Sequence, residues 1–237
     1  MAGEGNDMEY HHIREAVFVS RPNRFIAHVT LTDGTPVRAH VKNTGRCAEL
    51  LVPGARVWLE YSQNPARSTP CDLVAVQKGP LLINMDSAAP NSAAGEWLAA
   101  GGLGPLEGLR PEYTLGESRF DFYAMQQGRP LLVEVKGCTL EQGGVARFPD
   151  APTLRGLKHV RELTRLAGEG YRCCVLIVIQ MKGIHTFCPN WQTHRDFGLA
   201  LRQAADTGVE VRAVDCRVTP SSMTVDAPVP VNLALPE

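Results

Sequence analysis

The sequence predicts a mixed fold, in which a small β-barrel precedes a larger α/β domain. Residues 10–80 carry short strand-like runs separated by turn residues, with few helical signals. Residues 81–237 alternate strand-like and helical patterns instead. The 237-residue chain is 44% hydrophobic, which is enough apolar material for a sizeable core. Residues 1–9 are polar and glycine-rich, and we expect them to form a flexible tail.

Five short strands are expected in the first domain. The Asp33-Gly34 pair supplies the positive φ angles that a hairpin turn requires, and Pro53-Gly54 marks another turn. Because the OB-fold is a five-stranded barrel, five strands with few helices indicate an OB-like barrel. The strands are expected at residues 13–20, 25–31, 37–41, 56–61 and 73–77.

The second domain is expected to hold a mixed sheet with helices packed on it. Residues 80–90 read as a crossing segment, and Asn91 or Ser92 is expected to cap the helix that follows. Residues 173–179 are apolar on both faces, as in a central buried strand. The expected helices are 91–100, 153–167 and 195–206, and the expected strands are 112–115, 118–125, 130–136, 173–179 and 209–214.

Composition restricts the possible functions. The net charge of −1 excludes a uniformly basic nucleic-acid binder, so any such binding must use local patches. Seven cysteines without a CxxC pair argue against a disulfide framework or a zinc ribbon, and favour a reducing compartment. The longest strongly apolar run, 173–179, is far shorter than the roughly 20 residues that span a bilayer. We therefore expect a cytoplasmic protein without a membrane partner.

Two carboxylates and a lysine are expected to meet on one hairpin. Glu134 and Lys136 share one face of a strand, because side chains alternate, and Asp121 lies on the preceding strand. Charges on an otherwise apolar strand are costly to bury unless they are paired or bind a metal. Such a trio suits Mg²⁺-dependent phosphodiester hydrolysis, in which a lysine stabilises the developing charge. A structural salt bridge is the alternative explanation.

Ten short segments spread along nearly the whole chain form a distinctive set. The segments are Asn23-Arg24-Phe25, Thr32-Asp33-Gly34, Asn43-Thr44-Gly45, Pro53-Gly54, Ser118-Arg119-Phe120-Asp121-Phe122, Glu134-Val135-Lys136, Phe148-Pro149-Asp150-Ala151-Pro152-Thr153, Arg155-Gly156, Lys158-His159 and Glu162-Leu163. In their identity and order they resemble the sugar fermentation stimulation protein A (SfsA) family, and residues 148–163 are the most specific.

The resemblance implies an N-terminal OB-like domain (10–80) and a C-terminal, restriction-endonuclease-like PD-(D/E)XK domain (81–237). It implies catalytic roles for Asp121, Glu134 and Lys136, and a Mg²⁺ or Mn²⁺ ion held by Asp121, Glu134 and the Val135 carbonyl. It also implies binding to DNA with little sequence preference, and it carries a link to sugar-utilisation genes. It says nothing of oligomeric state.

Three functions are compatible with these features. The first is a metal-dependent nuclease. The second is a non-catalytic DNA-binding regulator of sugar (maltose-type) metabolism genes that keeps a vestigial nuclease site. The third, a carbohydrate enzyme, has no support in the residues beyond the family name. An intact Asp–Glu–Lys set favours retained catalysis or at least retained metal binding.

Further candidates carry two interpretations each. Glu112 is either an additional metal ligand or general base, or an exposed strand glutamate. Asp150 either caps the following helix or reaches the metal, and capping or a role in the loop structure is favoured.

Basic residues supply the candidate DNA contacts. Residues 10–78 hold nine Lys/Arg and five Asp/Glu, so that 9 − 5 gives +4, but they show no aromatic cluster for stacking bases. The helix from residue 153 carries a largely basic face, which suits either phosphate contact or simple solvation. The candidates are Arg24, Lys42, Arg46, Arg119, Arg155, Lys158 and His159.

Overall fold

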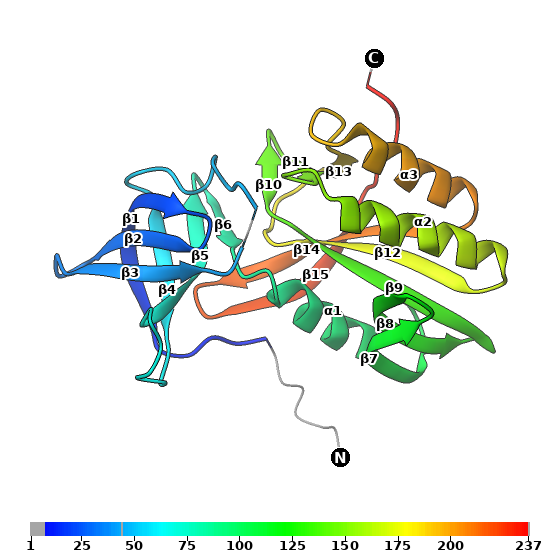
Figure 1. Cartoon of the computed structure of the whole chain (residues 1–237), viewed down its shortest axis with the longest axis horizontal. Coiled ribbons are helices and arrows are strands. Elements are labelled where there is room, and N and C mark those ends of the chain that lie inside the picture. The colour runs from blue at the N-terminus through cyan, green and yellow to red at the C-terminus, as the bar shows by residue number, and fades with distance from the viewer. Residues whose placement is uncertain (1–7, 44, 237) are drawn as a thin grey trace.

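The computed structural model describes residues 8–43 and 45–236, which form two adjoining lobes (Figure 1). Most of the predicted tail, residues 1–7, lies outside the described residues. The same holds for residue 44, which belongs to the predicted turn at 43–45. Met8 and Glu9, also assigned to the tail, are instead paired with the strand at 222–229.

The N-terminal lobe is a closed five-stranded barrel, which confirms the predicted OB-fold. Antiparallel pairs join β1 to β2, β2 to β3, β1 to β4 and β4 to β5, and a parallel pairing of β3 with β5 closes the barrel. Inward-facing residues alternate along the strands, as they must around a small barrel. The strands are β1 Ile13–Asn23, β2 Ile26–Leu31, β3 Pro36–Val41, β4 Arg56–Tyr61 and β5 Cys71–Lys78.

The C-terminal lobe contains a six-stranded sheet in the order β15-β14-β12-β9-β8-β7. β9, β12 and β14 run parallel, and antiparallel strands complete both edges. A smaller sheet holds β10 (Leu140–Gln142), β11 (Val145–Phe148) and β13 (Thr186–Pro189). The large sheet consists of β7 Glu107–Leu115, β8 Ser118–Gln126, β9 Arg129–Cys138, β12 Arg172–Ile179, β14 Glu210–Thr219 and β15 Ser222–Val229.

Helices cover both faces of the large sheet. α2 (Leu154–Gly168) and α3 (Arg195–Asp206) pack on the face that presents Leu132 and Val175. α1 (Ala89–Ala99) packs on the opposite face, against Val133 and Val135. The mixed sheet with parallel members and packed helices was predicted, and α3 has the predicted bounds. Within the described residues, no helix is both long and apolar enough to cross a bilayer.

Several local predictions were wrong. The first helix begins at Ala89 without a side-chain cap, because Pro90 occupies its first turn and Asp86 Oδ1 accepts from the Ala88 amide just before it. Thr153, not Asp150, caps α2 by accepting from the Gly156 amide. The segment 80–90 contains a strand, β6 (Leu81–Asn84). β10, β11, β13 and β15 were not predicted either.

The two lobes share one core and a buried polar joint. One cluster of buried apolar residues runs from Phe18 in the barrel to Phe197 in α3. The Gln180 side-chain amide donates to the carbonyl oxygens of Asn84 and Asp86, and the Asn84 amide donates to the Gln180 carbonyl at 2.9 Å. Outside this joint, Lys78 of the barrel forms an ion pair with Glu141. The joint therefore holds the barrel in place beside the end of β9.

Candidate metal centre

The structure brings Asp121, Glu134 and Lys136 together where β8 separates from β9. The β8–β9 pairing ends with Phe122 opposite Val133, and Asp121, which directly precedes Phe122 in the chain, lies just outside the paired region. Beyond it, Asp121 Oδ2 accepts from the Val135 amide at 2.7 Å, so a carboxylate takes the place of a main-chain acceptor. Asn91 Nδ2 in α1 donates to Asp121 Oδ1 at 2.8 Å. The Asp121 carboxylate is thus fixed from both sides.

Glu134 is buried beneath α2. It lies on the sheet face opposite Val133 and Val135, as predicted, and only 2% of its surface is exposed. Its Oε1 accepts from Lys136 Nζ and from the His159 ring in α2. Its Oε2 is buried and, within the described residues, has no hydrogen-bond partner. A buried carboxylate oxygen without a donor is costly, and a bound cation would satisfy it.

Lys136 shows where a positive charge fits. Its Nζ contacts Glu134 Oε1 and lies 3.2 Å from the Val135 carbonyl oxygen. Both oxygens belong to the ligand set expected for the metal, and the Val135 amide bonds to Asp121. Because the amide and carbonyl of one strand residue point the same way, the Val135 carbonyl also faces the Asp121 side. The Lys136 ammonium therefore lies beside two oxygen atoms, Glu134 Oε1 and the Val135 carbonyl oxygen, that are expected to bind the metal.

The two carboxylates have pKa values shifted in opposite directions. Burial, and secondly the charge of Glu134, raise the pKa of Asp121 above its ordinary value. Burial also acts to raise the pKa of Glu134, but the His159 hydrogen bond and the Lys136 ammonium outweigh it and lower that pKa. A divalent cation between them would favour the ionised form of both groups.

The donor set suits a hard cation rather than zinc. Within residues 8–43 and 45–236, no group of three or more His, Cys, Asp and Glu side chains is arranged around a common metal position. Mg²⁺ does not need one, since it is commonly held by one or two carboxylates and keeps several waters. Asp121, Glu134 and the Val135 carbonyl would supply three oxygens, and the unpartnered Glu134 Oε2 fits such a role.

Two other acidic candidates make their side-chain contacts outside this centre, although the β7–β8 register places Glu112 opposite Asp121. Glu112 in β7 has a side chain that is 72% exposed and is 3.8 Å from Arg119. This matches the exposed-glutamate interpretation, although its φ of 54° is unusual for a residue with a side chain. Asp150 turns toward the barrel, where its Oδ2 accepts from the Cys47 amide at 2.9 Å. It links the lobes rather than capping a helix.

The predicted DNA contacts occupy three kinds of position. Arg155 and Lys158 are exposed on α2, and Arg24 and Arg46 are exposed on barrel loops. Lys42 is held by Asp86, Arg119 lies beside Glu112, and both remain partly accessible. His159 differs from its expected surface role, because it is buried on the sheet-facing side of α2 and bonds to Glu134.

Sequence reasoning missed the contribution of Asn91 to this centre. The Asn91 pattern pointed to a helix cap, and its bond to Asp121 depends on the packing of α1 beside β8. For His159 a signal existed, because it lies four residues before Leu163 on the apolar face of the helix. That spacing indicates burial but cannot identify Glu134 as the partner.

Comparisons with known proteins agree with this architecture. The family model described as "SfsA N-terminal OB domain" matches residues 19–85, and that of the "Sugar fermentation stimulation protein RE domain" matches residues 88–222. A sugar fermentation stimulation protein homolog of Desulfitobacterium hafniense (strain Y51) is 51% identical over 226 residues, which cover 95% of this chain and 99% of that protein. A homolog from Ruminiclostridium cellulolyticum is 45% identical over 227 residues, covering 95% and 100% respectively.

Among solved structures, that of Pyrococcus furiosus SfsA in complex with Ca²⁺ matches with a TM-score of 0.85. The match covers 95% of this chain and 98% of that chain at 24% identity, and it shows a shared fold. The two family models and the relatives together account for nearly the whole sequence. The chain therefore belongs to the sugar fermentation stimulation protein (SfsA) family.

Proposed function

We propose that this protein is a divalent-metal-dependent nuclease that binds DNA with little sequence preference. The observation that carries the proposal is the convergence of Asp121, the buried Glu134 and the Val135 carbonyl beside the Lys136 ammonium. All seven cysteines are free thiols, which supports a cytoplasmic location. The P. furiosus relative is described as a complex with Ca²⁺, another hard cation that prefers oxygen ligands.

Each residue has a separate role in the proposed reaction. A bound Mg²⁺ or Mn²⁺ would supply Lewis-acid stabilisation of the phosphate and an acidified water. Asn91 orients the Asp121 carboxylate, and His159 holds Glu134 ionised and in position. Lys136 places a positive charge where the scissile phosphate gains negative charge. The surrounding burial strengthens that attraction, because the local dielectric is lower than that of water.

Cleavage of nucleic acids tests the proposal directly. We expect purified protein to cleave one or more of a panel of single-stranded, duplex and branched DNA and RNA substrates with Mg²⁺ or Mn²⁺. Asp121→Asn should abolish this activity, whereas Asp196→Asn, which changes an exposed aspartate in α3, should not. If wild-type protein free of contaminating nuclease cleaves nothing with either metal, the nuclease proposal fails.

Metal binding is a second expected result. Calorimetry should detect one Mg²⁺ or Mn²⁺ site in wild type and a large loss of affinity in Asp121→Asn, because one of two anionic ligands is removed. Asp196→Asn again serves as the matched control. Equal metal affinity in Asp121→Asn and wild type would contradict the assignment of the ligands.

The alternative is a DNA-binding regulator whose metal site is no longer used. The names of the relatives, which refer to sugar fermentation, favour a link to sugar metabolism. Metal binding and DNA binding without cleavage would support this alternative over the nuclease.

DNA affinity is expected to fall steeply with salt and to depend little on sequence. Phosphate contacts release counterions, so each one contributes about 0.9 to the slope of log affinity against log salt concentration for duplex DNA. Arg155→Met and Lys158→Met, on the exposed side of α2, should each reduce that slope, whereas Arg217→Met, on β14, should not. Anisotropy titrations at several salt concentrations measure it, and strong preference for one sequence would count against this mode of binding.

A further inference from the structure

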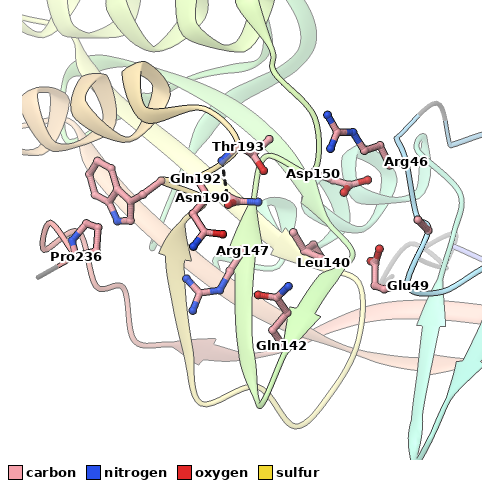
Figure 2. A pocket seen from close by; sticks show the side chains of 12 residues that line it. Arg46, Glu49, Leu140, Gln142, Arg147, Asp150, Asn190, Gln192, Thr193 and Pro236 are labelled. Carbon is pink, nitrogen blue, oxygen red and sulfur yellow. Dashed lines mark hydrogen bonds between the residues drawn. The ribbon is translucent and has the colours of Figure 1, made fainter.

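A polar cleft runs along the joint between the two lobes. It consists of two adjoining cavities of about 400 Å³ and 500 Å³, which share Leu140, Arg147 and Asp150 in their walls. The smaller cavity begins at Gly137, the residue that follows Lys136, and extends between Arg24 of the barrel and the loop before α2. The larger continues past Arg46 toward the loop at residues 190–193, as Figure 2 shows.

Three arginines from separate segments line this cleft. Arg24 lies between β1 and β2, Arg46 follows β3, and Arg147 is in β11. Within the described part of the chain, the Arg46 and Arg147 guanidinium groups form no hydrogen bond or ion pair, and Arg147 Nε is buried without a partner. Positive groups left without partners along a cleft are suited to anionic ligands.

The acidic residues of the cleft do not neutralise these arginines through direct contacts. Asp150 Oδ2 is used by the Cys47 amide. Glu49 Oε1 is buried and has no hydrogen-bond partner among the described residues. Burial is the main cause that raises the pKa of the Glu49 carboxyl group. An acceptor of this kind suits the amino group of a nucleic-acid base rather than a phosphate. The cleft thus offers cations for a backbone and polar groups for base edges.

We propose that this cleft holds a single nucleic-acid strand and leads it to the metal centre. The inference rests on the proposed nuclease function and specifies its substrate as a single strand or the unpaired arm of a duplex. A positively charged groove that follows one backbone is typical of single-strand binding, and unpaired bases leave their Watson–Crick edges free for the polar groups of the cleft. Gly137 lines the smaller cavity and directly follows Lys136 in β9, so a strand held in the cleft would reach the centre by continuing beyond Gly137. The contacts come from arginines of both lobes rather than from an aromatic surface of the barrel.

Binding without cleavage tests this inference. Fluorescence anisotropy in EDTA compares a short labelled single strand with a blunt duplex of the same sequence. We expect tighter binding of the single strand, and a loss of about tenfold or more in its affinity for Arg46→Met and Arg147→Met. The salt slope for the single strand should fall by about 0.7 for each lost contact. Arg212→Met, outside the cleft on β14, is the matched control.

Arg46 is exposed on a loop, so its variant keeps the test valid if Arg147→Met fails to fold. Photo-crosslinking of a single strand that carries 4-thiothymidine gives a second measurement, and crosslinked peptides should come from residues 45–49 and 139–150. Equal affinity for the single strand and the duplex, unchanged by Arg46→Met, would overturn the cleft proposal even if metal-dependent cleavage is observed. Binding of the single strand without any cleavage would support the cleft and contradict the nuclease function alone.

Discussion

Replacing Lys136 by Met is expected to remove about 2–4 kcal/mol of transition-state stabilisation from nucleic-acid cleavage, while affinity for DNA changes little. The Lys136 side chain is only 14% exposed, and its ammonium contacts Glu134 Oε1 and the Val135 carbonyl. A positive group held in such a position needs little reorganisation when the phosphate gains charge. Met retains most of the side-chain stem and removes the charge.

The measurement is single-turnover cleavage beside anisotropy binding for wild type, Lys136→Met and Lys182→Met. Lys182 is a partly exposed lysine that pairs with Asp215 and Asp226 on the C-terminal strands, so its variant controls for general loss of charge. A decrease in DNA affinity as large as the decrease in rate would indicate that Lys136 only binds substrate. Unchanged turnover in Lys136→Met would remove it from the reaction.

Gly137→Ala is expected to destabilise the protein by about 1–3 kcal/mol, which is the usual cost of forcing a methyl group into a packed site. A Cβ at Gly137 would lie 2.6 Å from Pro90 Cγ and 2.6 Å from Gln180 Oε1. Pro90 is a rigid ring in the first turn of α1, and Gln180 is fixed by the buried joint. Since neither group can withdraw easily, the start of α1 must shift.

That shift should also weaken metal binding, because Asn91 follows Pro90 and orients Asp121. Urea denaturation gives the free energy of unfolding, and calorimetry gives the metal affinity. Gly168→Ala is the matched control: nothing lies within 4 Å of its added Cβ at the end of α2, so it should be neutral or slightly stabilising. If Gly137→Ala proves as stable as Gly168→Ala, the packing at this junction is looser than these contacts indicate.

The parts of the centre that local patterns could predict are those set by a single hairpin. Strand alternation placed Glu134 and Lys136 on one face, and the preceding strand supplied Asp121. The bounds of α2 were predicted to within one residue, since its apolar spacing acts locally. The five barrel strands followed from turn residues that act over a few positions.

The features that could not be predicted depend on tertiary contacts. β10, β11 and β13 are only three or four residues long, and they exist because they pair with each other. Asn91 is a residue type that often caps helices, yet its side-chain amide donates a hydrogen bond to Asp121, which is distant in the sequence. Asp150 reads as a cap for the same reason, but the barrel amide of Cys47 lies within its reach. Short polar side chains can form several alternative local hydrogen bonds. Which partner they bind therefore depends on groups that the tertiary fold brings close.

The shared core and the Gln180 joint make the barrel and the α/β lobe one cooperative folding unit. Hinged proteins that close on a ligand have small, polar interfaces between their moving parts. Here the apolar cluster continues from one lobe into the other, and Gln180 bonds across it. Swinging the lobes apart would expose that cluster to water, which opposes a clamp-like closure. Under the proposed function, a substrate would therefore meet the two lobes in a fixed arrangement instead of inducing them to close.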